Sequence, residues 1–279
     1  MPELPEVETV RVILEREVTG RHITGVSFRD FLDVIGAMAP DEFAAMVTGR
    51  TLLPPERRGK YLVLPLDDGN ALVIHLRMTG RLLVTGSEAL PVRFEHLAIH
   101  LDNGKDVRFA DQRKFGRVLH SSLDKARNAL STSLGPEPLG RAFTASYVRG
   151  RTRGRTAPIK SFLLDQRHVA GLGNIYVDEA LFRSRIHPLT PAGSITESQA
   201  ASLVRSIRRV LRSSIENQGT TFSSFENPYG ERGSNARFLS VYGRAKEGLP
   251  CVRCGKPLEW FKLAGRGTSF CPNCQRLAP

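Results

Sequence analysis

Near the start of the chain, hydrophobic and polar positions alternate with the period of a helix. The segment "LPEVETVRVILERE" predicts a helix over residues 4–17, and Gly20 beyond it is a stop signal. Its apolar positions fall on one helical face: Leu4, Val7, Val10, Ile13 and Leu14. We therefore expect an N-terminal helix that packs one face against a core.

The pattern changes between residues 61 and 121. The runs "YLVLPL", "ALVIHL" and "RLLVTG" are short and apolar, and they are separated by "DDGN" and "RMTG". The runs "HLAIHL" and "DVRFAD" then flank "DNGK", whose Asn103-Gly104 pair is a strong signal for a two-residue hairpin. Strands this close together, without helices between them, predict an antiparallel sandwich or barrel over roughly residues 2–130.

After the linker-like "LGPEPLG" (134–140) the pattern becomes helical. It predicts helices over 159–166, 174–184 and 197–217, the last opened by Thr196 with Gln199 three residues later, as in a capping box. From about residue 240 the chain is a small cysteine-bearing module. We predict an α+β, multidomain protein divided at 1–133, 134–239 and 240–279.

Composition supports a sizeable core and an anionic partner. Hydrophobic residues make up 41% of the 279, and 40 Lys and Arg outnumber 28 Asp and Glu, which gives a net charge of +12. Such a surplus suits nucleic acid or an anionic membrane surface, although a merely soluble basic protein has it too. No run reaches the ~18 apolar residues of a membrane span, and the N-terminus lacks a signal-peptide pattern, so we expect a cytoplasmic protein without membrane partners.

The basic residues are clustered rather than spread. Residues 141–160 hold six Lys or Arg and no acid, and residues 231–279 hold nine against three acids. Between the first two predicted helices of the second part, "AGLGN" places a glycine turn directly before Asn174, where free backbone N–H groups suit a phosphate. A solvated face and a tightly packed turn are the plain alternatives.

The four cysteines follow the spacing Cys251-x2-Cys254-x16-Cys271-x2-Cys274. Two Cys-x2-Cys knuckles of this kind hold one tetrahedral Zn²⁺, and with all four thiolates used the ion is structural rather than catalytic. Disulfides or a redox pair are disfavoured by the expected location. Between the knuckles, "AGRGT" predicts a hairpin tip that carries Arg266, either solvated or reaching a phosphate.

Several residues are unusual for a sheet domain. Met78 lies in the turn "HLRMTG", and Arg113 and Phe115 lie in "ADQRKFGR" after a strand. An exposed Met and Phe are suited to wedging into a base stack and filling the space left by an extruded base. Both also suit the core, which for Phe115 is the interpretation that the residues alone favour. Lys60, just before a strand, is either a solvated lysine or a general acid/base.

These motifs occur in one order that resembles the bacterial formamidopyrimidine-DNA glycosylases, which excise oxidised purines. They are "PELPEVET", "RRGKYL", "HLRMTG", "DQRKFGR", "GLGNIYVDEALF", "VYGR" and the four-cysteine module. The resemblance covers essentially the whole chain. It implies an N-terminal β-sandwich with an N-terminal helix, a helix–two-turn–helix domain and a C-terminal zinc-ribbon finger.

The resemblance also implies roles for individual residues. Pro2 is implied as the nucleophile, Glu3 as the acid that helps to open the sugar, Glu6 as its support, and Lys60 as a phosphate contact that assists proton transfer. The residues that fill the void and face the orphaned cytosine would be Met78, Arg113 and Phe115. Those that grip the kinked DNA backbone would be His96, Arg155, Lys160, Asn174 and Arg266, of which Arg266 also serves the last elimination step.

The implied chemistry suits an N-terminal proline. A free α-amino group titrates near about 8, far below a lysine, so a useful fraction is unprotonated at neutral pH. The secondary amine of Pro2 attacks the anomeric carbon and forms a cationic iminium, after which β- and δ-elimination cut the strand. Met1 has to be removed first, since the Pro2 nitrogen is otherwise an amide.

The chain departs from the family's "HLGMSG" and "DPRRFG" at Arg77, Gln112 and Lys114. These departures concern the geometry of the two loops and the selectivity for the base opposite the lesion. We expect a monomeric glycosylase/AP lyase on damaged double-stranded DNA, with one structural Zn²⁺ and no organic cofactor. The related endonuclease VIII branch, which removes oxidised pyrimidines, usually begins "PEGPE" rather than "PELPE". A zinc-finger DNA-binding protein without catalysis is the other alternative, and nothing in it would demand Pro2 or Glu3.

Overall fold

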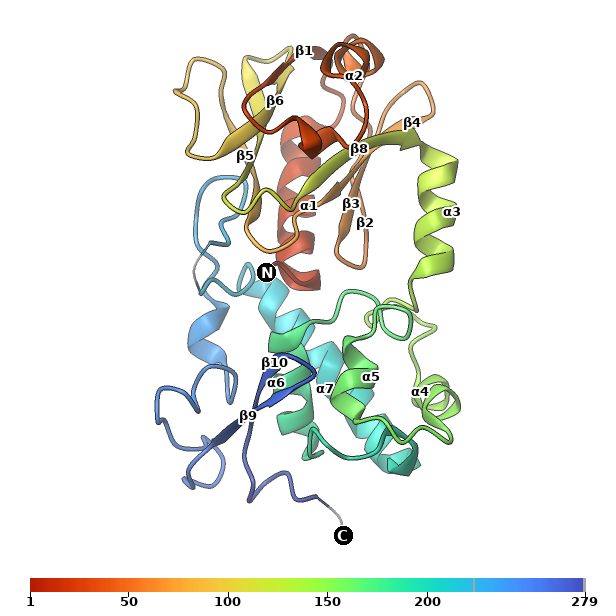
Figure 1. Cartoon of the computed structure of the whole chain (residues 1–279), viewed down its shortest axis with the longest axis vertical. Helices are drawn as coiled ribbons and strands as arrows, with labels where there is room; N and C mark the ends of the chain where they lie inside the picture. The colour runs from red at the N-terminus through yellow and green to blue at the C-terminus, as the bar shows by residue number, and fades with distance from the viewer. Residues whose placement is uncertain (223, 278–279) are drawn as a thin grey trace. The chain divides into compact units, whose positions relative to one another are not determined.

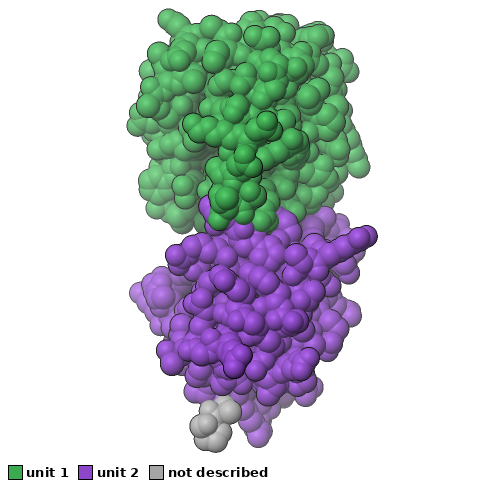
Figure 2. All heavy atoms as spheres, turned by 90° about the vertical axis from the view of Figure 1, so that its right-hand side faces the viewer, with its two compact units in different colours: residues 1–132, 217–234 green, residues 133–216, 235–279 purple. Residues whose placement is uncertain are grey.

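The structure is a computed structural model that describes residues 1–222 and 224–277. The chain forms two compact units, coloured separately in Figure 2: Met1–Thr132 with Asn217–Ser234, and Ser133–Glu216 with Asn235–Pro279. The first division falls at the predicted linker. Residues 217–234 return to the first unit, and the cysteine module joins the helices of the second, so the three-part division stays a prediction.

The first unit contains two four-stranded antiparallel sheets (Figure 1). One has the order β1 (Ile23–Phe28), β6 (Glu95–Leu101), β7 (Lys105–Asp111), β5 (Gly80–Gly86). The other has the order β2 (Glu56–Arg58), β3 (Tyr61–Pro65), β4 (Asn70–His75), β8 (Arg117–Ser122). The predicted antiparallel sandwich is confirmed. Chain neighbours such as β3 and β4 form hairpins, and distant strands such as β1 with β6 and β4 with β8 complete the sheets.

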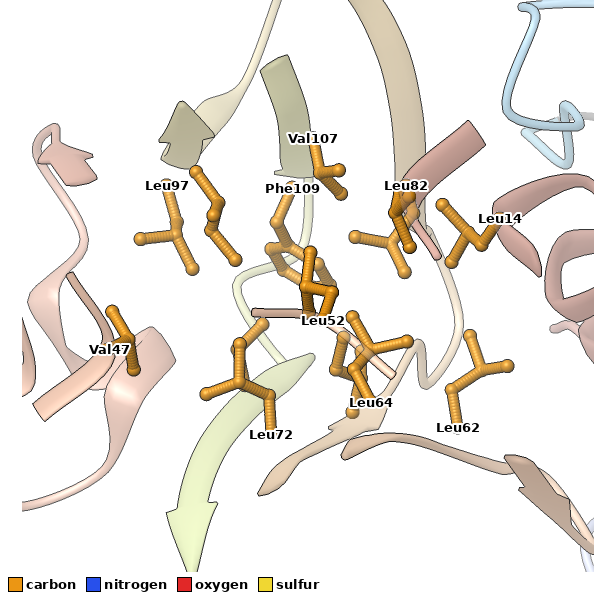
Figure 3. Close-up of a cluster of buried hydrophobic side chains, with 14 of the residues drawn as sticks. Leu14, Val47, Leu52, Leu62, Leu64, Leu72, Leu82, Leu97, Val107 and Phe109 are labelled. Carbon is orange, nitrogen blue, oxygen red and sulfur yellow. The ribbon is translucent and has the colours of Figure 1, made fainter. Parts of the chain in front are cut away.

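Helix α1 (Leu4–Val18) and both sheets bury apolar side chains in one core. Figure 3 shows Leu14 of α1 together with Leu62 and Leu72 of the second sheet and Leu97 and Phe109 of the first. Burying each such side chain stabilises the fold by about 1.5–3 kcal/mol relative to leaving it exposed. The helix predicted from the period of residues 4–17 is therefore confirmed, together with its buried face.

A hairpin forms at the predicted Asn103-Gly104 turn, but the loop between β6 and β7 has three residues, 102–104, rather than the two predicted. Gly104 has φ +72°, a left-handed conformation that glycine adopts without a Cβ penalty, and the Asn103 side-chain oxygen accepts a hydrogen bond from the Lys105 N–H (3.2 Å). The turn sets the register of β6 and β7, in which Ile99 pairs with Val107. Both side chains then face the core.

The second unit is mainly helical: α4 (Ala145–Thr152), α5 (Ile159–Leu164), α6 (Asn174–Ser184) and α7 (Glu197–Glu216). The predicted capping box is present at the start of α7. The Gln199 N–H donates to Thr196 Oγ1 (3.2 Å), and the Thr196 N–H donates to Gln199 Oε1 (2.8 Å). The unit also contains the hairpin of β9 (Glu259–Leu263) and β10 (Arg266–Phe270).

Three helices were not predicted: α2 (Pro40–Val47), α3 (Leu123–Ser133) and α4. Each buries a single pair of side chains four residues apart, namely Phe43 with Val47, Ala126 with Leu130, and Val148 with Thr152. One such pair is too short a pattern to show a helical period, so packing against the rest of the unit determines these helices. Among the described residues, no helix combines the length and hydrophobicity needed to cross a membrane.

Candidate functional site

The carboxylates next to Pro2 are buried at the start of α1. Glu3 is 2% exposed and Glu6 is 1% exposed. Glu6 accepts a hydrogen bond from the Glu3 N–H on Oε2 (2.8 Å) and one from the Thr220 N–H on Oε1 (2.8 Å). Glu6 therefore fixes the backbone beside Pro2 and also anchors the segment 217–234 to the same unit.

Lys60 lies at a turn that is tied to α1. Gly59 before it has φ +58°, and its carbonyl accepts a hydrogen bond from Arg57 Nη1 (3.0 Å). Arg57 in turn pairs with Glu8 of α1 across 2.7 Å. Lys60 is only 8% exposed, so the solvated-lysine interpretation is wrong. A nearly buried ammonium at a turn tied to α1 suits a general acid/base.

A functional candidate that the sequence did not suggest is His75, at the end of β4. It is the cross-strand partner of Tyr61, next to Lys60 in the chain. Burial, and then the charges of Arg77 and Lys60, lower the pKa of His75 to about 4. Its Nδ1 accepts a hydrogen bond from the Arg77 N–H (2.9 Å), so the neutral ring carries its proton on Nε2. A histidine that is neutral at pH 7 beside a buried lysine can take part in a proton relay.

Asp111, at the end of β7, organises two loops. It is 1% exposed and accepts hydrogen bonds from the Phe115 N–H (2.8 Å) and the Gly116 N–H (2.7 Å) on Oδ2. Its Oδ1 accepts from the Arg113 N–H (3.1 Å) and from the Thr79 hydroxyl. One buried carboxylate thus holds the loop after β7 against the loop before β5. The sequence did contain a signal, an Asp at a strand end before a Gly-containing turn.

Met78, Arg113 and Phe115 form one exposed cluster above Asp111. Arg113 Nη1 lies 3.0 Å from Met78 Sδ, and its guanidinium lies over the Phe115 ring, 4.8 Å from the centroid. Met78 is 40% exposed and Phe115 is 47% exposed. The interpretation that both side chains pack into the core is therefore wrong, because Asp111 holds the backbone so that they point outward.

The departures at 77 and 114 share a backbone feature. Arg77 has φ +54° and Lys114 has φ +58°, a left-handed conformation that glycine adopts more easily. Lys114 Nζ pairs with Asp30 across 3.1 Å and lies over the Phe31 ring. Both residues adopt this conformation, and Lys114 links its loop to the segment after β1.

The structure places His96 inside the protein. Its side chain is 2% exposed, with Nε2 2.8 Å from the Asp111 carbonyl and Nδ1 3.2 Å from Asp30 Oδ1. The expectation of a direct phosphate contact does not match this burial. His96 instead fixes the backbone of Asp111, beneath the exposed cluster.

In the second unit, two predicted site residues meet at the Gly267 carbonyl. Lys160 Nζ donates to it (2.9 Å), and so does Asn174 Nδ2 (2.8 Å). Arg266, exposed at the start of β10, is the preceding residue. The two side chains therefore fix the position of the β9–β10 hairpin, which carries Arg266 at its surface.

Lys160 is completely buried and ion-paired. Its Nζ lies 2.7 Å from Asp178 Oδ1, and Asp178 Oδ2 accepts a hydrogen bond from the Ser269 N–H (2.9 Å). Burial raises the pKa of Asp178 to about 7, against the opposing effect of Lys160. As with His96, direct contact with a phosphate does not match the burial, and Lys160 acts through Gly267.

The glycine turn before α6 is buried, which favours the tightly packed turn over one that presents free N–H groups. Gly171 has φ +82°, and its N–H donates to Gln166 Oε1 (2.8 Å). The turn ends at Gly173, so α6 begins at Asn174. Arg155 is exposed, with its Nε donating to the Arg151 carbonyl (2.7 Å). The helix start and Arg155 belong to the basic part of this unit, where an anion is favoured.

The middle of α6 binds another motif of the sequence. The Glu179 carboxylate accepts hydrogen bonds from the N–H groups of Ser240 (2.9 Å), Val241 (2.8 Å) and Tyr242 (2.9 Å). Burial raises the pKa of Glu179, and these donors oppose the shift. Glu179 thereby joins "GLGNIYVDEALF" to "VYGR", two motifs that are far apart in the sequence.

The four cysteines have the geometry of a metal site. Their sulfurs lie within 4.8 Å of one another, with Cys251 to Cys274 at 3.9 Å and Cys254 to Cys271 at 3.6 Å. Four thiolates about 2.3 Å from one tetrahedral zinc ion lie about 3.8 Å apart, whereas a disulfide needs about 2.05 Å. The donor set therefore fits a tetrahedral metal and excludes disulfides.

Comparisons with known proteins agree along the whole chain. The model of the formamidopyrimidine-DNA glycosylase N-terminal domain matches residues 1–118, that of the H2TH domain of the same enzymes matches 134–226, and a zinc finger found in FPG and IleRS matches 248–277. The formamidopyrimidine-DNA glycosylase of Chloroflexus aurantiacus is 46% identical over 275 residues, which cover 99% of this chain and 98% of that protein. This chain belongs to the formamidopyrimidine-DNA glycosylase family.

Solved structures of the family have the same fold. The wild-type Lactococcus lactis Fpg bound to DNA containing N7-benzyl-Fapy-dG matches with a TM-score of 0.91 and 36% identity, covering 99% of this chain and 100% of that chain. The MutM (Fpg) protein of Thermus thermophilus matches with a TM-score of 0.87 and 41% identity over 100% of both chains. As a member of this glycosylase family, the chain is a DNA glycosylase of base-excision repair, and the predicted family and fold class are confirmed.

Four residues with notable contacts were not singled out from the sequence: His75, which is partly buried, and Asp111, Asp178 and Glu179, which are buried. Three of them are carboxylates that bind backbone N–H groups. Asp111 binds those of the loop that follows it, and Asp178 and Glu179 bind those of distant segments. All four lie inside motifs quoted for the family, in "HLRMTG", "DQRKFGR" and "GLGNIYVDEALF", but the letters do not say what each side chain binds. That information exists only in the folded chain.

Proposed function

We propose that this glycosylase removes oxidised purines, 8-oxoguanine and formamidopyrimidines, from duplex DNA opposite cytosine, and then cuts the strand as an AP lyase. The observation that carries the proposal is the pair of buried carboxylates, Glu3 and Glu6, next to Pro2 at the start of α1. Burying two carboxylates destabilises the folded protein, so a contribution to stability does not explain them. Beside an N-terminal amine they suit proton transfer at that amine.

The chemistry begins after removal of Met1, which frees the Pro2 nitrogen as a secondary amine. Its lone pair forms a bond to C1′ of the sugar while the bond to the damaged base breaks, and the base leaves with a proton. Glu3 protonates the ring oxygen as the sugar opens. The resulting iminium acidifies C2′, so loss of a proton there releases the 3′ phosphate, and a second elimination releases the 5′ phosphate.

Other residues of the first unit support these steps. Glu6 holds Glu3 in place through the Glu3 N–H, as a positioning residue. Lys60 contacts the phosphate and transfers protons, and the neutral His75 beside it is able to relay one. Met78, Arg113 and Phe115 fill the space that the extruded base leaves, and Arg113 faces the orphaned cytosine.

In the second unit, Arg155, Asn174 and Arg266 grip the DNA backbone, and Arg266 also assists the last elimination. Lys160 supports them by binding Gly267, as His96 supports the exposed cluster of the first unit. One zinc ion held by the four cysteines would cross-link the base of the hairpin and take no part in the chemistry. We expect a monomer that works in the bacterial cytoplasm and associates with the nucleoid when it binds DNA.

The proposal is tested by borohydride trapping on a duplex that contains 8-oxoguanine opposite cytosine. The processed protein should form a covalent adduct with DNA, and Pro2→Gly with Met1 retained should not. Absence of an adduct with correctly processed protein would refute the lyase chemistry and favour a non-catalytic DNA-binding protein. A preference for duplexes with an oxidised pyrimidine would instead favour an endonuclease VIII-like activity.

A further inference from the structure

Helix α7 carries a row of arginines that none of the roles above uses. Arg205, Arg209 and Arg212 are spaced four and three residues apart, so they lie on one helical face, and all three are exposed. Helix α6 packs against α7 and adds Arg183 near its C-terminal end (Figure 1). We call these four residues, with Arg253 of the cysteine module, the α7 arginine surface.

The charges of this surface are not neutralised within the protein. Among the described residues, no carboxylate forms an ion pair with Arg183, Arg205, Arg209 or Arg212, although Glu216 lies at the end of the same helix face. Burial, and then the positive charges of Arg209 and Arg253, lower the pKa of the Arg183 guanidinium. Like charges held this close repel one another, and an anion bound between them would remove that cost.

By contrast, Arg208 and Arg253 bind backbone carbonyls within this unit. Arg208 donates to the carbonyls of Pro138, Gly140 and Phe143 (2.9–3.2 Å) and so holds the linker. Arg253 donates to the Phe182 carbonyl (3.2 Å) and lies over the Phe182 ring, which fixes its guanidinium. Within residues 1–222 and 224–277, the side chains of the other arginines of the surface make no such contact.

The surface is hollowed between its arginines. A hollow of about 380 Å³ is lined by Arg183, Ser202, Arg205, Ser206, Arg209 and Arg253. Guanidinium groups and serine hydroxyls are the donors that proteins use for phosphate oxygens. A second hollow of about 560 Å³ continues along the helix past Arg212. The donors thus follow the helix axis, as contacts to successive phosphates do, rather than converging on one small anion.

This surface is distinct from the proposed DNA grip in the same unit. Asn174 begins α6 and binds the Arg266 hairpin, whereas Arg183 lies nine residues later, about 14 Å along the helix axis. The two basic groups therefore lie near opposite ends of α6. A duplex gripped by Asn174 and Arg266 is not the natural occupant of the arginine row on α7.

We infer that the α7 arginine surface binds the phosphate backbone of a second DNA segment. The inference rests on the proposed function only in taking DNA as the partner, and it needs no catalysis. A protein with two DNA-binding surfaces can contact a new duplex before it releases the old one, which allows direct transfer between segments during the search for damage.

The test follows release of the protein from a labelled duplex that carries a stable abasic-site analogue. Undamaged competitor duplex is added at increasing concentration, and the release rate is measured. For the wild type, the release rate should rise in proportion to competitor. For the variant Arg205→Gln/Arg209→Gln/Arg212→Gln, the slope should fall about tenfold, because the charges that attract the second duplex are gone. Its rate of excision from a short lesion duplex should be unchanged.

A charge-matched control is Arg16→Gln/Arg21→Gln/Lys125→Gln, at three exposed positions of the first unit. Its release rate should depend on competitor concentration as in the wild type. An equal fall of that slope in this control would show that net charge alone causes the effect, and would overturn the proposal. A release rate independent of competitor in the wild type would also overturn it. Failure to bind the labelled duplex at all would count against the proposed function instead, so the two failures are distinguishable.

Discussion

Arg113 donates a hydrogen bond to the sulfur of Met78 across 3.0 Å, so two loops that are 35 residues apart in sequence present one contiguous surface. In the proposed function, Met78 enters the base stack of the DNA, while Arg113 faces the orphaned cytosine on the undamaged DNA strand. Met78→Ala should slow excision from duplex DNA by about tenfold, a loss of about 1.4 kcal/mol in transition-state stabilisation. Cleavage at a preformed abasic site should keep its rate, since no base has to be extruded. Single-turnover rates on both substrates provide the check, and equal losses would refute the wedge.

Asp111 binds three backbone N–H groups and one hydroxyl, so its removal should affect both stability and activity. Asp111→Ala leaves those buried donors without their acceptor, and we expect the free energy of unfolding to fall by about 3 kcal/mol. Excision should slow as well, because the loops that carry Met78 and Phe115 lose their shape. Urea denaturation measures the first effect. Asp102→Ala, at an exposed position in the hairpin after β6, is the matched control and should change neither quantity.

His75 should make stability depend on pH. Its pKa is lowered from 6.5 to about 4 in the folded protein, so between these values the unfolded chain binds the proton more readily. Stability should therefore fall as pH drops from about 6.5 to 4, by at most about 3 kcal/mol. His75→Gln removes this contribution. The difference in unfolding free energy between wild type and variant should be constant above pH 7 and shift in favour of the variant below pH 6. A constant difference throughout would contradict the assignment.

Arg266 and Lys160 should respond differently to salt. Arg266 is exposed and is proposed to contact a phosphate, so Arg266→Gln should reduce the slope of log K against log salt by about 1. Lys160 is buried against Asp178, so Lys160→Met/Asp178→Leu should leave the slope unchanged while binding weakens, because Gly267 loses a donor. The double variant avoids leaving Asp178 buried without a partner. A reduced slope in the double variant would show that Lys160 does reach a phosphate.

Metal removal should affect the second unit selectively. The chain has only the four cysteines of the cluster, so reaction of its thiols should release roughly one zinc ion per chain. The Cys271 N–H donates to Gln275 Oε1 (2.9 Å), and Gln275 Nε2 donates to the Ile186 carbonyl (2.9 Å), so the cluster is tied to the segment after α6. We expect DNA binding to be lost on zinc removal and regained when zinc is added back. Retention of full binding without zinc would contradict a structural role.

The sequence by itself determined the elements with a long repeating pattern and the sites with fixed local spacing. The period of residues 4–17, the Asn103-Gly104 turn and the Thr196 capping box act within a few residues, so their outcome does not depend on the rest of the chain. The two Cys-x2-Cys knuckles likewise indicated one metal site, and the ordered motifs identified the family.

Only the tertiary structure decided which distant groups meet and which side chains are buried. Helices α2, α3 and α4 each bury a single pair of side chains, and packing supplies what their pattern lacks. His96 and Lys160 are residue types that often contact DNA, yet their polar atoms bind carbonyls and carboxylates of other segments, because a buried polar group has to be paired. Phe115 is apolar yet exposed, since Asp111 fixes its backbone. Burial and pairing depend on the whole unit, which no short stretch of sequence contains.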